Sequence, residues 1–327
     1  MKKNIIVTGG AGFIGSCIVG RLNSYGIDNI LVIDKFRSNG KEKNLNKKKY
    51  CDFIDKDDFI EKIIDKPNYF QDIDTIFHMG ACSSTLNTDI KYLQKNNTDY
   101  SITLAKWCMK KDTRFIYASS AATYGDGDNG FTDDLDSLET LKPLNPYGTS
   151  KHLFDLWIKK NGLFNDLLGI KFFNVFGPNE YHKGEMRSVI NKAFPTVKDK
   201  GIMKLFKSYK DGYKDGKQKR DFIYIKDVLE VMIFFYENNK IAGLFNLGRG
   251  TAETWNKIAN SMFKALRKET NIEYIKMPEE LQTRYQYFTE ANMQKLNLAG
   301  YEKEFTSIED SVRDYIVNYL NTDDPYY

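Results

Sequence analysis

One stretch near the N-terminus indicates the fold: Ile5-Ile6-Val7-Thr8 followed by Gly9-Gly10-Ala11-Gly12-Phe13-Ile14-Gly15. The first four residues are β-branched and lack helical spacing, which predicts a buried strand. Apolar residues then recur every three or four positions through Leu22, which predicts an amphipathic helix. The apolar run from Asn29 to Asp34 predicts a second strand. Strand, glycine turn, helix and strand make a βαβ unit, which implies a parallel sheet.

The same alternation continues along the chain. Continuous apolar runs of this kind are typical of parallel strands buried on both faces. We therefore expect an α/β protein with a Rossmann-type doubly wound parallel sheet and a smaller mixed α/β domain. After Gly177-Pro178 the pattern is mixed, and a near-repeat at 209–216 predicts a surface loop. The further expected strands are 74–78, 114–118, 170–174 and 221–225, and the expected helices are 92–109, 151–160 and 227–236.

Composition excludes several classes of protein. The 327 residues include 48 Lys and Arg against 44 Asp and Glu, a net charge of +4, which argues against a nucleic-acid partner. Apolar residues make up 41%, and no run approaches the ~18 residues that span a bilayer, so no membrane association is expected. The cysteines lack a C-x-x-C pair and the histidines are scattered. We therefore expect reduced thiols, a cytoplasmic protein and no metal site.

The glycine turn has the spacing of a dinucleotide-binding motif. Gly10-x-Gly12-x-x-Gly15 fits G-x-G-x-x-G, and Gly9, Gly12 and Gly15 fit the G-x-x-G-x-x-G variant. Glycines permit the tight turn and let the backbone approach a pyrophosphate, which the N-terminus of the next helix attracts. The motif alone is weak, but its position between a strand and a helix makes it specific.

Residues after the second strand bear on the choice of dinucleotide. Asp34 lies 24 residues after Gly10, where a carboxylate can bond the adenosine ribose and favours NAD. Arg37 and Lys41 follow closely, and basic residues there can neutralise a 2′-phosphate, which favours NADP. The two signals conflict. We interpret the run Lys47-Lys48-Lys49 as a solvated face.

Tyr147 and Lys151 form a Y-x-x-x-K pair at the start of a predicted helix, where positions four apart share one face. A phenol has an ordinary pKa of ~10, and a neighbouring ammonium should lower it, so that Tyr147 can accept a proton from a carbinol. Ser120 follows the strand at 114–118 and can bond the same substrate oxygen. Together these residues predict redox chemistry on an alcohol.

Longer strings resemble a known group. The glycine turn, Ser120, Tyr147 and Lys151 resemble the extended short-chain dehydrogenases/reductases that act on nucleotide sugars. Within this group, the chain is similar to the ADP-glyceromanno-heptose 6-epimerase family from Ile5 to about Tyr319. The strings that carry this similarity are 80–85, 118–125, 172–178, His182-Lys183-Gly184, 220–224 and 284–289, of which the His182 string and Arg284-Tyr285-Gln286 are the specific ones.

The resemblance implies an isomerase that inverts C6 of the heptose in ADP-D-glycero-D-manno-heptose for lipopolysaccharide core synthesis, through a ketone formed with tightly held NADP rather than NAD. It implies a homo-oligomer, a pentamer, of chains with two domains. These are a dinucleotide-binding domain, 1–173 plus 221–248, and a nucleotide-sugar-binding domain, 174–220 plus 249–327. The implied catalytic residues are Tyr147, Lys183, Ser120 and Lys151; the cofactor-binding residues are Gly9, Gly12, Phe13, Ile14, Gly15, Asp34, Lys35, Arg37, Lys41, Lys56, Met79, Gly80, Ala81, Cys82, Ser83, Asn96, Lys151 and Val175; the substrate-binding residues are Asn174, Glu185, Lys192, Phe206, Lys207, Ser208, Arg220 and Tyr285.

Lys183 also has a physical case of its own. An epimerase that keeps its cofactor returns hydride to either face of a ketone, so proton transfer is needed from two directions, and desolvation can lower the pKa of a lysine toward a useful range. Departures from the better-known enterobacterial pattern lie in the substrate and nicotinamide regions. They are Met79, Glu185, Lys192, Lys207 and the insertion 211–217.

Two alternatives remain open. One is another nucleotide-sugar epimerase, such as a UDP-hexose 4-epimerase. The other, from a different class, is a cofactor-binding regulatory protein without turnover, although such proteins often lose the Tyr or Lys that this chain keeps. A 4,6-dehydratase is less favoured, because Ala121-Ala122 stand where elimination needs an acid.

Overall fold

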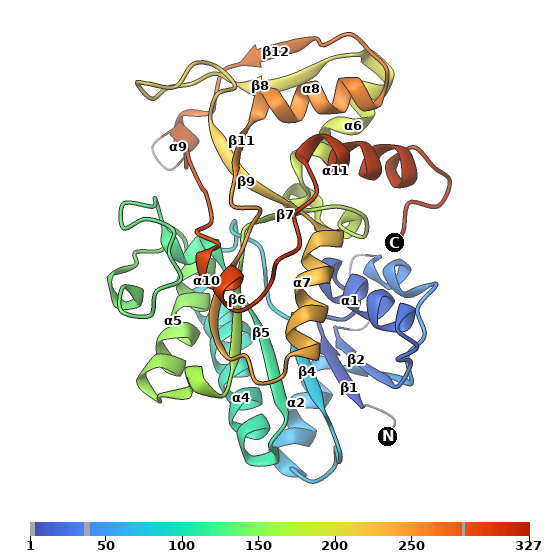
Figure 1. The fold of residues 1–327 in the computed structure, drawn as a ribbon, viewed down its shortest axis with the longest axis vertical. Helices are drawn as coiled ribbons and strands as arrows, with labels where there is room; N and C mark the ends of the chain where they lie inside the picture. Colours follow the sequence, from blue (N-terminus) through green and yellow to red (C-terminus); the bar gives the residue numbers. More distant parts are fainter. Residues whose placement is uncertain (1–3, 36–39, 283–284) are drawn as a thin grey trace.

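The computed structural model describes residues 4–35, 40–282 and 285–327. Its main sheet has the strand order β10-β6-β5-β4-β1-β2-β3 (Figure 1), and every neighbouring pair is parallel. The order runs outward from the first strand in both directions, which confirms the expected doubly wound sheet. The strands are β1 (Ile5–Thr8), β2 (Ile30–Asp34), β3 (Asp52–Asp55), β4 (Thr75–His78), β5 (Arg114–Ser120), β6 (Leu168–Phe172) and β10 (Gly243–Leu247).

Helices cover both faces of this sheet, and β1 shows how the sequence dictates it. Successive strand residues point to opposite faces. Ile5 and Val7 pack in one buried cluster with residues of α1 and α7, whereas Ile6 packs in another with residues of α2, α4 and α5. The flanking helices are α1 (Phe13–Ser24), α2 (Lys56–Asp65), α3 (Ile90–Leu93), α4 (Tyr100–Lys111), α5 (Pro146–Lys160) and α7 (Ile225–Glu237).

A smaller group of elements lies beyond one end of the main sheet, at the top of Figure 1. It contains a three-stranded sheet in the order β11-β9-β7 and a parallel pair of β12 with β8. Its elements are β7 (Asn174–Phe176), β8 (Met203–Phe206), β9 (Lys219–Tyr224), β11 (Ala252–Thr254), β12 (Ile272–Ile275), α6 (Val189–Lys200), α8 (Trp255–Ala265), α9 (Glu279–Gln282) and α11 (Ile308–Tyr315). The short helix α10 (Gln294–Leu298) instead packs against β10 of the main sheet.

Short helical turns complete the chain. Two are π-helical, and the one at Gln94–Asp99 interrupts the helix expected over 92–109 between α3 and α4. The strand expected at 170–174 is divided between β6 and β7. The 3-10 turns are Lys41–Leu45, Ala121–Tyr124, Leu138–Thr140, Leu163–Asn165 and Tyr181–Met186, and the second π-helical turn is Ile316–Leu320.

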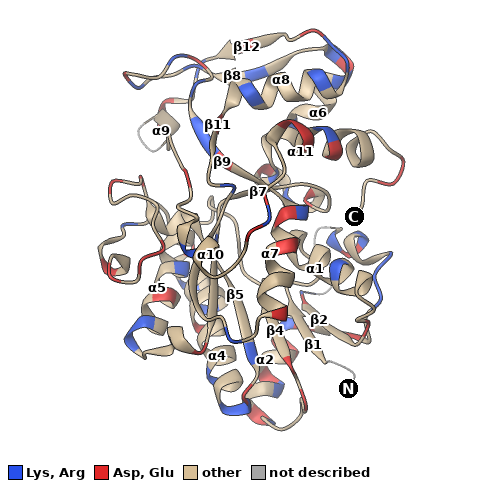
Figure 2. Cartoon of the chain, in the orientation of Figure 1, with Lys and Arg blue, Asp and Glu red and all other residues tan. Residues whose placement is uncertain are grey.

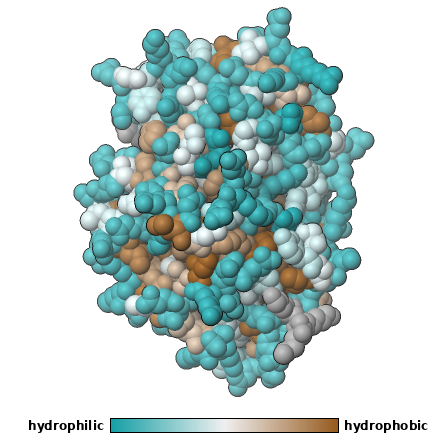
Figure 3. Space-filling model, viewed as in Figure 1, coloured by the Kyte–Doolittle hydropathy of each residue, from teal (hydrophilic) through white to brown (hydrophobic). Residues whose placement is uncertain are grey.

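Both signs of charge are interspersed over the chain (Figure 2), and the face drawn in Figure 3 is mostly hydrophilic with small apolar patches. In the part of the chain that the structure describes, no helix has the length and apolar character needed to cross a membrane. The solvated-face interpretation of the lysine run holds for Lys47 and Lys49, which are exposed. It is wrong for Lys48, which is half-buried and donates a hydrogen bond to the backbone oxygen of Tyr327.

Two glycines of α1 give a matched test of the packing at its start. A Cβ at Gly15 would lie 2.2 Å from the Gly9 carbonyl oxygen, whereas one at Gly20 would meet only the flexible end of Lys48, at 2.7 Å. We expect Gly15→Ala to lower the free energy of unfolding by about 1–3 kcal/mol through overpacking. Gly20→Ala should be neutral or stabilising by up to ~1 kcal/mol, because alanine favours a helix. Denaturant unfolding of both variants checks this, and equal effects would contradict it.

Candidate active site

The glycine turn brings backbone segments unusually close together. Gly9 has φ +64°, and a Cβ on it would lie 2.7 Å from the backbone nitrogen of Gly80. Gly12 is the N-cap of α1, and no described side chain caps this helix. The first backbone N–H groups of a helix have no partner within it, and the helix dipole adds positive charge there. The turn therefore offers an anion the narrow, positively polarised cradle that a pyrophosphate needs.

Asp34 lies at the end of β2 and is buried beside this cradle. Its carboxylate accepts hydrogen bonds from the backbone N–H groups of Ala11 at 3.0 Å and Lys35 at 2.7 Å, and it forms an ion pair with Lys41. The two predicted specificity signals thus meet in one contact, because Lys41 neutralises the carboxylate that would repel a 2′-phosphate. Arg37, the other expected cation, lies outside the described residues.

One cavity of about 720 Å³ opens where the carboxyl ends of β1, β2, β4 and β5 meet. In doubly wound sheets this edge is where ligands bind. Catalytic, cofactor-binding and substrate-binding predictions converge on its wall. The predicted residues that line it are Gly9, Gly12, Phe13, Ile14, Gly15, Asp34, Lys35, Lys41, Lys56, Met79, Gly80, Ala81, Cys82, Ser83, Asn96, Ser120, Tyr147, Lys151, Asn174, Val175, Lys183 and Glu185.

Other predicted substrate residues lie away from this wall, in the described part of the chain. Lys192 reaches it indirectly, through an ion pair of 3.8 Å with Glu185. The guanidinium of Arg220 lies 5.3 Å from the ring centre of Tyr285. The predicted residues outside the cavity wall are Lys192, Phe206, Lys207, Ser208, Arg220 and Tyr285.

Sequence reasoning missed several cavity residues. His182 lies in one of the strings that carry the family resemblance, which does not assign it to the site, although it lines the cavity. Burial and the nearby ammonium groups of Lys41 and Lys183 lower its pKa to about 4, so the ring is neutral. The hydroxyl of Thr85 donates to the sulfur of Met186 at 3.6 Å, and both residues line the cavity. Only the folded chain joins positions so far apart in sequence.

Tyr147 lies in the first turn of α5, which begins earlier than the expected helix. The side chain of Asn145 caps the helix by accepting a hydrogen bond from the backbone N–H of Gly148 at 2.8 Å. Burial raises the pKa of Tyr147, and a hydrogen bond with Ser120 opposes that rise. The expected lowering of this pKa by Lys151 is therefore wrong for the protein alone. Ser120 is the neighbour that favours the phenolate.

Lys151 is buried one turn further along α5. Its ammonium donates a hydrogen bond of 2.8 Å to the carbonyl oxygen of Ala118 in β5. Burial lowers the pKa of Lys151 to about 8, and the charge of Asp155 opposes this change. The amine is therefore protonated below about pH 8 and can present positive charge to the cavity.

Lys183 enters the cavity from a different part of the chain, the 3-10 turn Tyr181–Met186. Its ammonium lies 5.4 Å from the ring centre of Phe13, at the start of α1. Burial lowers the pKa of Lys183, while the charge of Glu180 opposes the shift. A lysine with a lowered pKa can exchange a proton more readily near neutral pH. Tyr147 and Lys183 thus bring two groups capable of proton transfer to one cavity.

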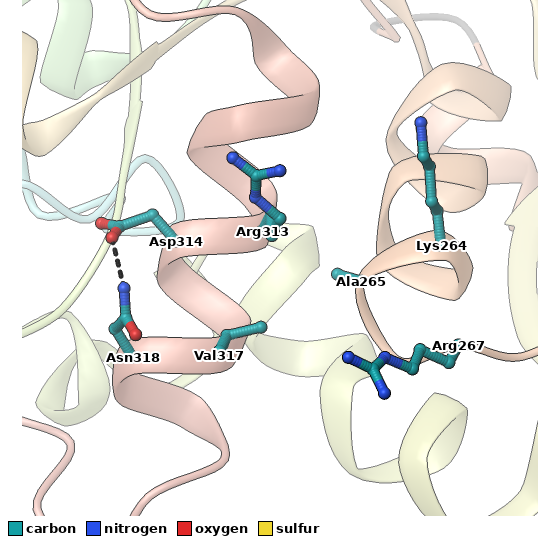
Figure 4. Close-up of a pocket in the computed structure, with 7 residues that line it drawn as sticks. All are labelled: Lys264, Ala265, Arg267, Arg313, Asp314, Val317 and Asn318. Atoms are coloured by element: carbon teal, nitrogen blue, oxygen red, sulfur yellow. Dashed lines mark hydrogen bonds between the residues drawn. The ribbon is translucent and has the colours of Figure 1, made fainter.

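A second hollow, of about 350 Å³, lies between α8 and α11 (Figure 4) and shares no lining residue with the first. Lys264, Arg267 and Arg313 lie around it, and all three are exposed. Asp314 on its wall is committed to Tyr224 at 2.6 Å and to other neighbours. The chemistry expected from the sequence therefore concentrates in the larger cavity.

A family model described as "NAD dependent epimerase/dehydratase family" matches residues 5–248. The chain belongs to this family. A relative from Nitratidesulfovibrio vulgaris, "ADP-L-glycero-D-manno-heptose-6-epimerase", is 50% identical over 323 residues, which cover 98% of this chain and 99% of the relative. A protein of the same name from Fusobacterium nucleatum is 46% identical with the same coverage. The resemblance inferred from the sequence is confirmed.

Solved structures agree with this placement. The Helicobacter pylori ADP-L-glycero-D-manno-heptose-6-epimerase has a TM-score of 0.79 and 26% identity, covering 97% of this chain and 96% of its own. A UDP-N-acetylglucosamine 4-epimerase from Methanobrevibacter ruminantium matches with the same TM-score and identity, covering 97% and 98%. The NAD-dependent family and the glycine cradle together support a nicotinamide dinucleotide as cofactor.

The hydroxyl of Tyr147 can be tested against another cavity tyrosine. Tyr147→Phe should lower turnover by at least ~10²-fold, since general acid–base groups typically contribute 10²–10⁴-fold. Dinucleotide binding should survive, because the ring remains to pack. Tyr100→Phe is the control, since that hydroxyl is committed to the Lys56 carbonyl oxygen at 3.1 Å. Steady-state kinetics measure the turnover of both variants, and dinucleotide titration measures their cofactor binding. A Tyr147→Phe variant that keeps more than about a tenth of the turnover would place the base elsewhere.

Proposed function

We propose that the protein inverts C6 of the heptose in ADP-D-glycero-D-manno-heptose and so produces ADP-L-glycero-D-manno-heptose, for lipopolysaccharide core biosynthesis. The observation that carries the proposal is the convergence of Tyr147 and Lys183 on one cavity, in a chain 50% identical to heptose 6-epimerases over nearly its whole length. Inversion at a carbinol needs a proton acceptor and a proton donor for two orientations of the intermediate ketone, and the two residues meet that need.

The proposed roles follow from the geometry. When bound, the nicotinamide supplies a hydride acceptor and donor at C6. Tyr147 holds or releases the proton of the C6 hydroxyl for one orientation of the sugar, and Lys183 does so for the other. Ser120 orients that oxygen and favours the phenolate of Tyr147. Lys151 stays protonated below about pH 8 and holds the nicotinamide ribose.

Substrate binding is proposed to extend beyond the main cavity. Asn174 and Glu185 line the cavity and are placed to contact the sugar. Arg220 is almost fully buried, and burial lowers its pKa, so an anionic partner would stabilise it. Arg220 and Tyr285 in the smaller domain are therefore assigned to the ADP moiety. The proposed domain division, 1–173 plus 221–248 and 174–220 plus 249–327, puts the sugar between the two.

The UDP-hexose 4-epimerase alternative has one observation in its favour. The Methanobrevibacter ruminantium 4-epimerase matches this fold as well as the Helicobacter pylori enzyme does. Two features favour the heptose substrate instead: the 43–50% identity to heptose epimerases and the half-buried Lys183 in the cavity. A regulatory protein without turnover would not need both Tyr147 and Lys151. The proposed location of the protein is the cytoplasm. Its proposed assembly is a homo-oligomer, and we expect a pentamer.

Incubation with ADP-D-glycero-D-manno-heptose, followed by NMR of the C6 configuration, tests the proposal. The expected result is an equilibrium mixture of both C6 epimers. UDP-glucose and UDP-N-acetylglucosamine serve as competing substrates, and neither should be epimerised at C4. Inversion of a UDP-hexose without any change in the heptose would replace the proposal by the 4-epimerase alternative.

NADP is the proposed dinucleotide, because Lys41 neutralises Asp34 next to the ribose position. The purified protein should carry NADP, since the hydride must be kept between the two half-reactions. Mass spectrometry of the extracted dinucleotide checks this. Lys41→Met should shift the affinity ratio toward NAD, because it leaves the Asp34 carboxylate to repel a 2′-phosphate. Recovery of NAD alone from the unmodified protein would contradict the assignment.

Lys183→Met removes the second proton-transfer group and keeps the side-chain length. Epimerisation should fall at least ~10²-fold, while a single reduction or dismutation of a C6 aldehyde analogue continues at one orientation. Arg187→Met is the matched control, since Arg187 lines the same cavity and binds Gly184 and Asn191 instead. Rapid-quench assays of both reactions distinguish the outcomes. Near-normal epimerisation by Lys183→Met would leave Tyr147 to serve both faces alone.

A further inference from the structure

A buried ion pair lies behind the catalytic residues, and no motif in the sequence indicates a role for it. Lys171 in β6 and Asp155 in α5 have side-chain exposures of 1% and 0%, and the Lys171 nitrogen lies 3.7 Å from a carboxylate oxygen of Asp155. Neither side chain belongs to the cavity wall that the structure describes. Removing two charges from water is costly, and a buried pair is weak evidence for stability alone. The contacts of the pair point to another use.

The Asp155 carboxylate ties α5 to the strand that carries Ser120. One oxygen accepts a hydrogen bond from the Tyr117 hydroxyl at 2.9 Å and the other from the Ser119 hydroxyl at 2.6 Å, both in β5. Asp155 also follows Lys151 by one helical turn, so the two side chains share one face of α5. The carboxylate therefore fixes the helix that bears Tyr147 and Lys151 against the strand end.

Lys171 holds the same strand end from the other side. Its ammonium donates a hydrogen bond of 2.6 Å to the hydroxyl of Thr123, which in turn donates to the backbone oxygen of Ser120 at 2.8 Å. The ammonium also lies 4.4 Å from the ring centre of Tyr124. The pair thus links the backbone of Ser120 to the helix of Tyr147 through one continuous set of polar contacts.

We propose that Asp155 and Lys171 are positioning residues of the epimerase: they set the placement of Ser120 and Lys151 and balance the charge beneath the cavity. The proposal rests on the proposed function and deepens it. Asp155 keeps the pKa of Lys151 higher than burial alone would leave it. The other titratable groups that interact with Asp155, Lys171 or Lys151 are Tyr147 and His152 in α5, Tyr117 in β5, Tyr124 in the following turn, Asp133, and His78 in β4.

Three variants separate positioning from mere support of the fold: Asp155→Asn, Lys171→Met and the double variant. Release of the copurified dinucleotide as the pH is raised from 6 to 10, followed by gel filtration and absorbance, measures binding without turnover. In Asp155→Asn, Lys151 should lose its proton at lower pH, so the alkaline limit of binding should move down by roughly half a pH unit or more. In Lys171→Met the alkaline limit of binding should move up, because the Asp155 carboxylate then lacks its ammonium partner and favours protonated Lys151 more strongly. Turnover should fall about 10-fold or more with little change in KM, since small misplacements of reacting groups can cost up to ~10²-fold.

Asp227→Asn is the matched control, because it removes another buried carboxylate, one bonded to Thr306. It should leave the pH limit and turnover unchanged. If a single variant fails to fold, the double variant keeps the test open, because it removes both members of the buried ion pair together. Its pH limit should lie near that of the unaltered protein, with turnover still reduced. Unaltered pH limits and turnover in the folded variants would overturn the proposal.

Failure of the unaltered protein to epimerise the heptose would overturn only the proposed function. The comparison of dinucleotide binding between the variants tests the positioning role by itself.

Discussion

Close backbone contact at the glycine turn is the constraint on which the rest of the site depends. Gly9 approaches Gly80 after β4, and Gly15 approaches the carbonyl of Gly9, at distances that no Cβ would allow. These contacts bring the carboxyl ends of β1 and β4 together and present the uncapped start of α1 to the cavity. The Asp34–Lys41 ion pair and the contact of Lys183 with the Phe13 ring both lie around this edge of the sheet.

Charge placed in a desolvated setting then gives the cavity its chemistry. Burial lowers the pKa values of Lys151 and Lys183, and in each case a buried carboxylate moderates the shift: Asp155 for the first and Glu180 for the second. The same surroundings raise the pKa of Tyr147. Burial thus brings the pKa values of the two lysines nearer to neutral pH. The pKa of the Tyr147 phenol moves the other way, and its hydrogen bond with Ser120 opposes that rise.

The sequence predicted most of the sheet and the cavity wall because those features leave local signals. Apolar runs mark strands buried on both faces, and glycine spacing marks the turn. β3 was missed because aspartates at both ends of Asp52-Phe53-Ile54-Asp55 leave only two apolar residues between them. The π-helical interruption before α4 was missed because apolar spacing does not report it.

Contacts between distant segments were beyond the reach of sequence reasoning. The place of His182 in the cavity and the lowered exposure of Lys48 depend on tertiary packing. The electrostatic prediction for Tyr147 failed for the same reason, since burial raises the pKa of the phenol and the hydrogen bond with Ser120, rather than the neighbouring ammonium, opposes that rise. Lys171 gave only a strand signal in the sequence, yet its ammonium lies beneath the catalytic helix.

In the proposed reaction, one cavity oxidises and re-reduces the same carbon of a sugar and serves both faces of the intermediate ketone. Heptose substrate deuterated at C6 can be converted in ordinary water and examined by mass spectrometry and NMR to test this hydride return. The product is expected to have an inverted C6 that retains its deuterium, because the hydride never exchanges with solvent. Inversion accompanied by loss of the deuterium to water would contradict it, since that result requires direct deprotonation of the carbon.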